Sequence, residues 1–164
     1  LLTKTREQLE PAAQAGHIVI AVDGTAGDLV VGCIVLWDLD QDKQGKMWYE
    51  LGTFLVRQGF RFSQTGQPIG DTLYRHMLFL NEDKNILGTT TNSSAIQTGL
   101  RHNMQMISFN ALPDNVRRAS CICPAIKTGT TQNDKCCLKD RVCRVRVSFH
   151  TWIRMSRPAH LAYT

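Results

Sequence analysis

The chain has 164 residues, 43% hydrophobic and 20% charged, with a formal net charge of +5. This composition is ordinary for a globular protein, and the length is sufficient for one domain with a hydrophobic core. The excess of positive charge is mild, and the basic residues form no long run. A solvated basic surface is the preferred explanation of this charge. A phosphate-bearing ligand comes second, and nucleic acid is a distant third. The longest apolar run, Val30 to Trp37, is only strand length, so no membrane association is expected.

The first helix is expected after Thr5. Thr5 followed by Gln8 has the spacing of a capping box, and Gly16 is a suitable stop. Pro11 lies inside this span, where it should kink or restart the helix because it has no N–H. The start of the chain, Leu1 to Arg6, becomes charged too early for a signal peptide and lacks Met, which favours a cytoplasmic protein and leaves open that the sequence is a fragment.

Two strands are predicted next, His17 to Asp23 and Leu29 to Trp37. Turn-forming residues from Asp23 to Gly27 separate them, so the pair should form an antiparallel hairpin. A polar turn from Asp38 to Lys46 then leads into the central part of the chain.

The central part reads as strand, loop and helix. Trp48 to Arg57 is rich in aromatic and β-branched residues, as in a buried strand, and a polar loop follows from Gln58 to Pro68. The following apolar residues fall on one face of a helix: Ile69, Leu73, Met77 and Leu80. Free N–H groups at a helix start favour an anion site there, although glycines are common in ordinary strand-to-helix connections too.

The second half is predicted to continue this alternation. The expected elements are strands at Asn85–Thr91, Met106–Asn110 and Val142–Met155, and a helix at Asn92–Met104. An excursion, Ala111–Arg141, lies between the last two strands, and Pro113 with Asp114 favours a short helix there through Arg118. The whole chain, residues 1–164, is therefore predicted to be one α/β (α+β) domain, a mixed central sheet with flanking helices.

Five of the six cysteines fall in or beside the excursion. They are Cys121, Cys123, Cys136, Cys137 and Cys143. Four thiolates could bind zinc, but the C-x-C spacing is unusual, no His lies among them, and adjacent cysteines cannot face the same side of a strand. Reduced, partly buried thiols are therefore preferred, and no metal is expected. A cytoplasmic location disfavours disulfides, and Cys33 is expected in the core.

Two motifs, in their order and distance apart, resemble the GNAT acyltransferases, the superfamily related to the histone acetyltransferases. The first runs from Glu50 to Arg61 and is similar to the family's acidic residue, strand and strand-end x-P-x-Y/F-R pattern, with a Gly-bearing turn and helix start at Gly66–Asp71. The second, Asn92 to Ala95 with Asn103-Met104, is similar to N-x-x-A…G-F. The resemblance covers residues 10–110 and 142–155.

The resemblance implies a GNAT-like fold and acetyl-coenzyme A (acetyl-CoA) as cosubstrate. A backbone N–H near Leu55 would bind the thioester carbonyl, and the strand end would pair with the pantetheine arm. The cofactor-binding residues implied are Leu55, Val56, Arg57, Arg61, Gly66, Gln67, Ile69, Gly70, Asp71 and Asn92. The family's first strand and helix have no counterpart before Leu1, which implies a truncated chain or a reduced fold.

The chain departs from the family pattern at the pyrophosphate turn. Pro68 stands where the family has Gly and supplies no N–H, so Gly66, Ile69 and Gly70 would have to provide the donors. Asp71 places a carboxylate near the phosphates, which is unfavourable unless its side chain points away.

Acyl transfer from a thioester needs a base for the amine and stabilisation of the thiolate. Glu50 is the candidate base; the alternative is a strand-end carboxylate exposed to solvent or paired with Lys46. Gly99 stands where many family members have the acidic Tyr, so His102 or Tyr49 is the candidate acid, unless both are structural.

Two functions remain open at this point. The first, which we prefer, is an N-acyltransferase acting on an amine acceptor that no motif identifies. The second is a non-catalytic CoA-binding or partner-binding module whose Cys-rich excursion forms the interaction surface. A homodimer is a candidate assembly for either.

Overall fold

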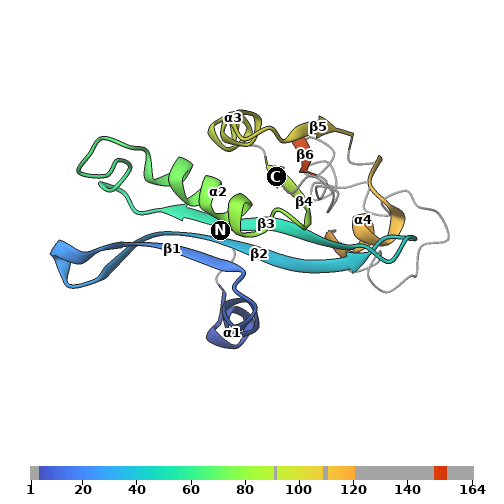
Figure 1. The fold of residues 1–164 in the computed structure, drawn as a ribbon, viewed down its shortest axis with the longest axis horizontal. Coiled ribbons are helices and arrows are strands. Elements are labelled where there is room, and N and C mark those ends of the chain that lie inside the picture. The colour runs from blue at the N-terminus through green and yellow to red at the C-terminus, as the bar shows by residue number, and fades with distance from the viewer. Residues whose placement is uncertain (1–3, 91, 109–110, 121–149, 155–164) are drawn as a thin grey trace, which may run out of the picture. The chain divides into compact units, whose positions relative to one another are not determined.

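The structure is a computed structural model that describes residues 4–90, 92–108, 111–120 and 150–154. The elements are α1 (Arg6–Gln14), β1 (Ile18–Asp23), the 3-10 turn η1 (Gly24–Ala26), β2 (Leu29–Gln41), β3 (Met47–Val56), α2 (Ile69–Leu80), β4 (Asn85–Thr90), α3 (Ser93–Arg101), β5 (Gln105–Ile107), α4 (Asp114–Ser120) and β6 (His150–Arg154) (Figure 1). The six strands follow the order β1-β2-β3-β4-β6-β5. β3 and β4 are parallel and β4 and β6 antiparallel, which confirms the predicted mixed sheet.

The chain divides into two compact units. In the described residues the first unit comprises 4–37 and Leu51–Asp83, and the second comprises Asp38–Glu50 with the described part of Lys84–Ser156. Strands β2 and β3 each contribute residues to both units. That the chain is a single domain stays a prediction.

The first unit begins as the sequence predicts. The Thr5 N–H donates to Gln8 Oε1 at 3.1 Å, as in a capping box, and Gly16 follows the helix with φ +71°. Helix α1 runs through Pro11 without a break, so the predicted restart is wrong. The hairpin is confirmed, since β1 and β2 pair antiparallel with a bulge between Ala21 and Val22.

Helix α2 packs against the strands of the first unit, on the side opposite α1 (Figure 1). Its buried side chains are Leu73, Tyr74, Met77 and Leu78. Leu80, predicted to extend the apolar stripe, is 53% exposed. The buried face follows the i+4 spacing from Met77 to Asn81 instead, where the Asn81 Nδ2 donates to the Met77 carbonyl at 2.9 Å.

Gly32 allows α2 to approach β2 closely. A Cβ at Gly32 would lie 2.9 Å from Leu73 Cδ1 and 3.1 Å from the Leu55 carbonyl oxygen. A side chain at this position would therefore push α2 away from the strands.

The second unit has its own core, built around Trp48 in β3. Trp48 packs with Leu87, Leu112 and Val116, all of them buried. Leu112 and Val116 belong to the predicted excursion, and its expected short helix is confirmed as α4. The start of the excursion is thus part of the packed second unit.

The turn between β2 and β3 is shorter than predicted, because β2 continues past Trp37 to Gln41. Asp42 closes this turn: its Oδ1 accepts from the Gln44 and Lys46 N–H groups, each at 2.9 Å. Its Oδ2 accepts from Trp48 Nε1 at 3.1 Å. These bonds tie the turn directly to the core of the second unit.

The hydrogen bond from Trp48, then those from the Lys46 and Gln44 N–H groups, hold the pKa of Asp42 below its usual range. A carboxyl with a lowered folded-state pKa stabilises the fold above its unfolded pKa of about 3.9, and this contribution is lost as pH falls through the folded-state pKa. We expect Asp42→Asn to lower the melting temperature at pH 7 and to lose this effect in acid. Thermal denaturation followed at a series of pH values measures this, and a melting difference that stays constant down to pH 2 would contradict it.

Several sequence predictions fall outside the described residues. All five cysteines of the cluster do so, as does the predicted strand Val142–Met155 apart from β6. Within the part of the chain that the structure describes, no three His, Cys, Asp or Glu side chains gather as metal ligands. No helix in that part is long and apolar enough to cross a membrane.

Candidate active site

The predicted site residues divide between the two units. Glu50, Asn92 and His102 lie in the second unit. The first unit holds the remaining nine: Leu55, Val56, Arg57, Arg61, Gly66, Gln67, Ile69, Gly70 and Asp71. The strand β3 joins the two sets, since it carries Glu50 and Leu55 to Val56.

Glu50 stands where the parallel pairing of β3 with β4 ends. The register joins Trp48–Glu50 to Asn85–Leu87, and β3 then continues to Val56. The Thr89 hydroxyl of β4 donates to Glu50 Oε1 at 3.0 Å, and the Glu50 side chain is half-buried. Glu50 is therefore an oriented carboxylate rather than one fully exposed to solvent.

The two candidate acids have structural contacts. His102 is the C-cap of α3, where its backbone N–H donates to the carbonyls of Thr98 and Gly99, and its ring is half-buried. The Tyr49 ring has the Lys84 ammonium 5.5 Å from its centre, a cation–π contact. His102 stays the preferred candidate, because the Tyr49 ring is engaged by the Lys84 ammonium.

Asn92 caps α3. Its Oδ1 accepts from the Ser94 N–H at 2.9 Å, which satisfies one of the first N–H groups of the helix. The sequence predicts both a cap and a cofactor contact for Asn92, and the structure confirms the cap.

The end of β3 shows which backbone groups face β2. The Arg57 N–H donates to the Val31 carbonyl at 2.7 Å, and the Leu55 carbonyl approaches Gly32 of the same strand. Backbone groups of successive strand residues point to opposite sides, so Val56 directs its N–H away from β2. The resemblance implies a thioester contact for an N–H near Leu55, which stays a prediction; in the structure the Leu55 backbone faces β2, whereas the Val56 backbone faces away from it.

Thr53 interrupts β3 with an unusual backbone conformation. Its φ is +48°, a left-handed value that costs a β-branched residue about 1–3 kcal/mol. A left-handed residue within a strand is characteristic of a bulge, which re-aims the backbone that follows. The neighbouring Gly52 would adopt this conformation without cost, yet Thr53 has it.

Two side chains of β2 hold Thr53. Trp37 Nε1 donates to Thr53 Oγ1 at 3.1 Å, and the Cys33 Sγ lies 3.6 Å from the Thr53 carbonyl oxygen as a weak donor. Each ordinary hydrogen bond contributes about 1 kcal/mol, so together they offset much of the backbone cost. Sequence reasoning missed this cluster, because a Thr in a strand carries no signal of a left-handed φ.

The loop before α2 uses its N–H groups internally. The Gly66 N–H donates to the Ser63 carbonyl at 2.9 Å, the Gln67 N–H to Ser63 Oγ at 3.0 Å, and the Ile69 N–H to the Arg61 carbonyl at 3.0 Å. The resemblance implies that Gly66, Ile69 and Gly70 provide N–H groups to a pyrophosphate and that Gln67 contacts the cofactor. In this structure the Gly66, Gln67 and Ile69 N–H groups are occupied within the loop, and the predicted cofactor contacts of these residues stay predictions.

Gly70 and Asp71 form the first turn of α2, whose N–H groups have no helical acceptor. A Cβ at Gly70 would lie 3.1 Å from the Phe54 ring, so this glycine also lets the helix start pack against β3. Asp71 suits a helix N-terminus, where the dipole favours negative charge. The phosphate contacts predicted for Gly70 and Asp71 stay predictions.

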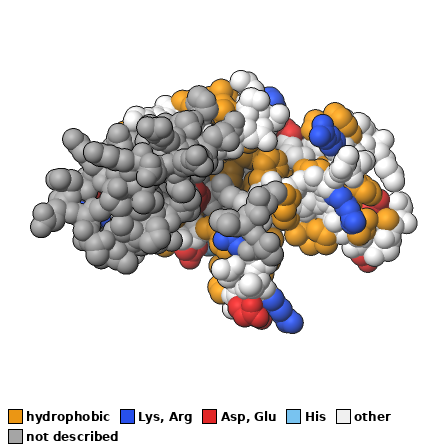
Figure 2. Space-filling model, turned by 180° about the vertical axis from the view of Figure 1, so that it is seen from behind, with side chains coloured by type: hydrophobic (Ala, Val, Ile, Leu, Met, Phe, Trp, Pro, Cys, Tyr) orange, Lys and Arg blue, Asp and Glu red, His pale blue; other side chains and the backbone are white. Residues whose placement is uncertain are grey.

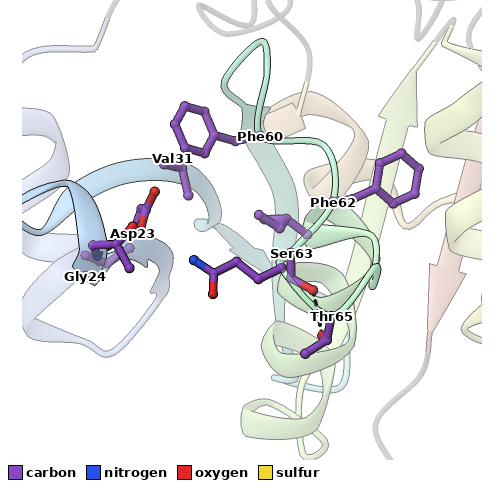
Figure 3. Close-up of a pocket in the computed structure, with 11 residues that line it drawn as sticks. Asp23, Gly24, Val31, Phe60, Phe62, Ser63 and Thr65 are labelled. Atoms are coloured by element: carbon purple, nitrogen blue, oxygen red, sulfur yellow. Dashed lines mark hydrogen bonds between the residues drawn. The ribbon is translucent and has the colours of Figure 1, made fainter.

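A pocket of about 410 Å³ lies in the first unit between the end of β1 and the loop after β3 (Figure 3). It is lined by Val22, Asp23, Gly24, Thr25, Val31, Phe60, Phe62, Ser63, Gln64, Thr65 and Ile69. Asp23 is the one charged residue among them. Figure 3 shows Phe62 pointing away from Asp23, and the hydrogen bond between the Ser63 and Thr65 hydroxyls, 2.9 Å long, fixes the loop wall.

The charge of this pocket opposes a phosphate. The Thr25 hydroxyl donates to Asp23 Oδ1 at 2.7 Å and the Thr25 N–H at 3.0 Å, and these bonds lower the pKa of Asp23. The carboxylate is therefore ionised at neutral pH and repels anions. Ile69 is the one predicted cofactor residue in the lining, so the pocket is not the predicted pyrophosphate site.

Comparison of the sequence with protein family profiles and with curated protein sequences finds no match. Solved structures do match. Rv2747 from Mycobacterium tuberculosis, in complex with CoA, has a TM-score of 0.61 and 19% identity over 96% of this chain and 85% of that one. A mosquito arylalkylamine N-acetyltransferase like 5b has a TM-score of 0.53 and 11% identity over 93% and 82% of the two chains. These similarities confirm the predicted GNAT-like acyltransferase fold.

Proposed function

We propose that this protein is an N-acyltransferase that transfers the acetyl group of acetyl-CoA to an amine. The observation that carries the proposal is the course of β3 within this fold. Its pairing with β4 ends at the oriented carboxylate of Glu50, and its later residues pass through the strained Thr53 to a backbone N–H at Val56 that points away from β2. Strained backbone gathers at functional sites, which supports a binding role for this strand end.

The chain offers several groups to acetyl-CoA. The Val56 N–H would donate to the thioester carbonyl and polarise it, and the Val56 carbonyl would accept from the pantetheine arm. The Gly70 N–H and the α2 dipole would bind a phosphate oxygen. Arg57 and Arg61 are exposed residues of the loop that follows β3, and they would supply positive charge to the phosphates.

The proposed reaction needs three proton transfers. Glu50 takes a proton from the ammonium form of the acceptor, directly or through water, and the freed amine attacks the thioester carbon. The nitrogen of the tetrahedral intermediate gives up a second proton to water, and the intermediate collapses with cleavage of the carbon–sulfur bond. The departing thiolate takes a proton, and His102 is the proposed donor. The products are the N-acetylated amine and coenzyme A.

The alternative, a module that binds CoA without catalysis, is supported by Gly99, which has no side chain at the position where many GNAT enzymes have Tyr. Two measurements separate the alternatives. Calorimetry with coenzyme A tests binding, and release of free thiol from acetyl-CoA in the presence of an amine panel tests turnover. Binding without turnover supports the module, and the absence of binding at millimolar coenzyme A would overturn both.

We expect Arg61→Gln to weaken coenzyme A binding by about 5-fold, since an exposed charge near a phosphate contributes modestly. Arg75→Gln in α2 is the matched control: it makes the same change of charge at another exposed position outside the loop. Calorimetry at two salt concentrations measures both. Equal affinities for the two variants would remove Arg61 from the cofactor site.

The acceptor, the cytoplasmic location, the homodimer and the lack of nucleic-acid or membrane partners stay predictions. The same holds for the reduced, metal-free state of the cysteine cluster. Elemental analysis of protein purified without chelator tests the last of these, and one equivalent of zinc would contradict it.

A further inference from the structure

Trp37 is the side chain that contacts the strained part of β3 most closely. Its indole N–H reaches the Thr53 hydroxyl at 3.1 Å. A Cβ at Gly52 would lie 3.1 Å from Trp37 Cδ1 and 3.2 Å from Nε1, so the indole edge lies directly against the Gly52 backbone. The ring therefore touches Gly52 and hydrogen-bonds the left-handed Thr53 that follows it.

The indole is itself fixed. It is half-buried on β2, and the Lys4 ammonium lies 4.5 Å from the ring centre. Cys33 lies four residues before Trp37 on β2, and its thiol contacts the carbonyl oxygen of the same Thr53. Burial raises the pKa of the Cys33 thiol, so it keeps its proton at neutral pH and remains a donor.

We propose that Trp37 is a positioning residue for acetyl-CoA: by holding Thr53 in its left-handed conformation it sets the direction of the Val56 N–H. Val56 follows Thr53 by three residues on the same strand, and a bulge fixes the orientation of the backbone beyond it. This inference rests on the proposed function, since it assigns Trp37 a role at the same binding site.

The left-handed conformation of Thr53 explains why the hydrogen bond from Trp37 is needed. A threonine released from its hydrogen bonds prefers the extended region, in which the later N–H groups would be turned away from their present directions. Only the fraction of molecules with the bulge in place would then bind the cofactor, and the apparent affinity would fall by that fraction. A glycine at position 53 would keep the left-handed conformation without help.

The test compares variants at Trp37 and Thr53 by calorimetry with coenzyme A and by the amide NMR signal of Val56. Trp37→Phe keeps an aromatic ring and removes the donor; Thr53→Val keeps the β-branch and removes the acceptor. Each should weaken binding by about 5-fold, the equivalent of one hydrogen bond, and shift the Val56 signal. The double variant should be no weaker than either single variant, because both changes break the same bond.

Thr53→Gly supplies the decisive contrast. It should bind coenzyme A within about 2-fold of the native protein and should be insensitive to an added Trp37→Phe, because glycine needs no hydrogen bond to stay left-handed. A purely structural threonine would show the opposite order, with the glycine variant the more damaged. Lys43→Met is the control: it removes an exposed cation in the turn between β2 and β3 and should leave affinity and the Val56 signal unchanged.

Two results would overturn the inference: equal loss of affinity in the glycine and valine variants, or an unchanged Val56 signal in Trp37→Phe. If the native protein binds no coenzyme A, the proposed function fails. The Val56 signal then still decides whether Trp37 sets the conformation of the strand. If Trp37→Phe does not fold, the comparison of glycine with valine at position 53 decides alone.

Discussion

Replacing Glu50 by glutamine is expected to lower acetyl-CoA turnover roughly 100-fold with little change in coenzyme A affinity. Glutamine has nearly the same volume and keeps an oxygen that can accept the hydrogen bond from the Thr89 hydroxyl. It cannot take a proton from the ammonium form of the acceptor. The loss should therefore appear in the chemical step, measured as free thiol released per enzyme under saturating acetyl-CoA.

Glu82→Gln is the matched control for this change. Glu82 is an exposed residue between α2 and β4, so the same change of charge occurs there at a position outside the predicted site residues. Its turnover should equal that of the native protein. The loss in Glu50→Gln should shrink as pH rises, because more of the acceptor amine is then already deprotonated. A native rate at pH 7 would return Glu50 to a structural role.

The order of the elements could be predicted because local patterns determine it. The hairpin follows from turn residues between two apolar runs, and α2 follows from apolar residues four apart. The prediction that Glu50 and the end of β3 lie on one central strand rested on this order of elements and on the resemblance to the GNAT motifs. These are features that sequence spacing encodes directly.

The details that the sequence does not encode depend on the direction of individual backbone groups. Leu55 and Val56 are adjacent and chemically similar, and only the pairing with β2 shows which of them faces away from it. The Gly66 turn resembles a phosphate loop in composition, but its N–H groups are used within the loop. The left-handed Thr53 arises from tertiary contacts with Trp37 and Cys33, which lie sixteen and twenty residues away in sequence.

Replacing Trp48 by alanine should have the largest effect on stability, about 3–5 kcal/mol, because it leaves a cavity in a core that closes around one large side chain. Trp48 is 3% exposed and packs with Leu87, Leu112 and Val116. The change would also remove the indole N–H from the buried Asp42 carboxylate, 3.1 Å away. Whole domains are stable by about 5–15 kcal/mol, so this loss is a large fraction of the total.

Urea denaturation followed by far-UV circular dichroism measures the effect, with two comparisons. Phe79→Ala removes an aromatic ring that is 67% exposed and should cost little. Trp48→Phe keeps most of the packing but loses the hydrogen bond, so it should be intermediate, and combining it with Asp42→Asn should cost less than the sum of the two. Because Trp48 also lies in the segment of β3 that pairs with β4 up to Glu50, the alanine variant should lose turnover even where it remains folded. Equal stabilities for the Trp48 and Phe79 alanine variants would mean that the second unit does not depend on this core.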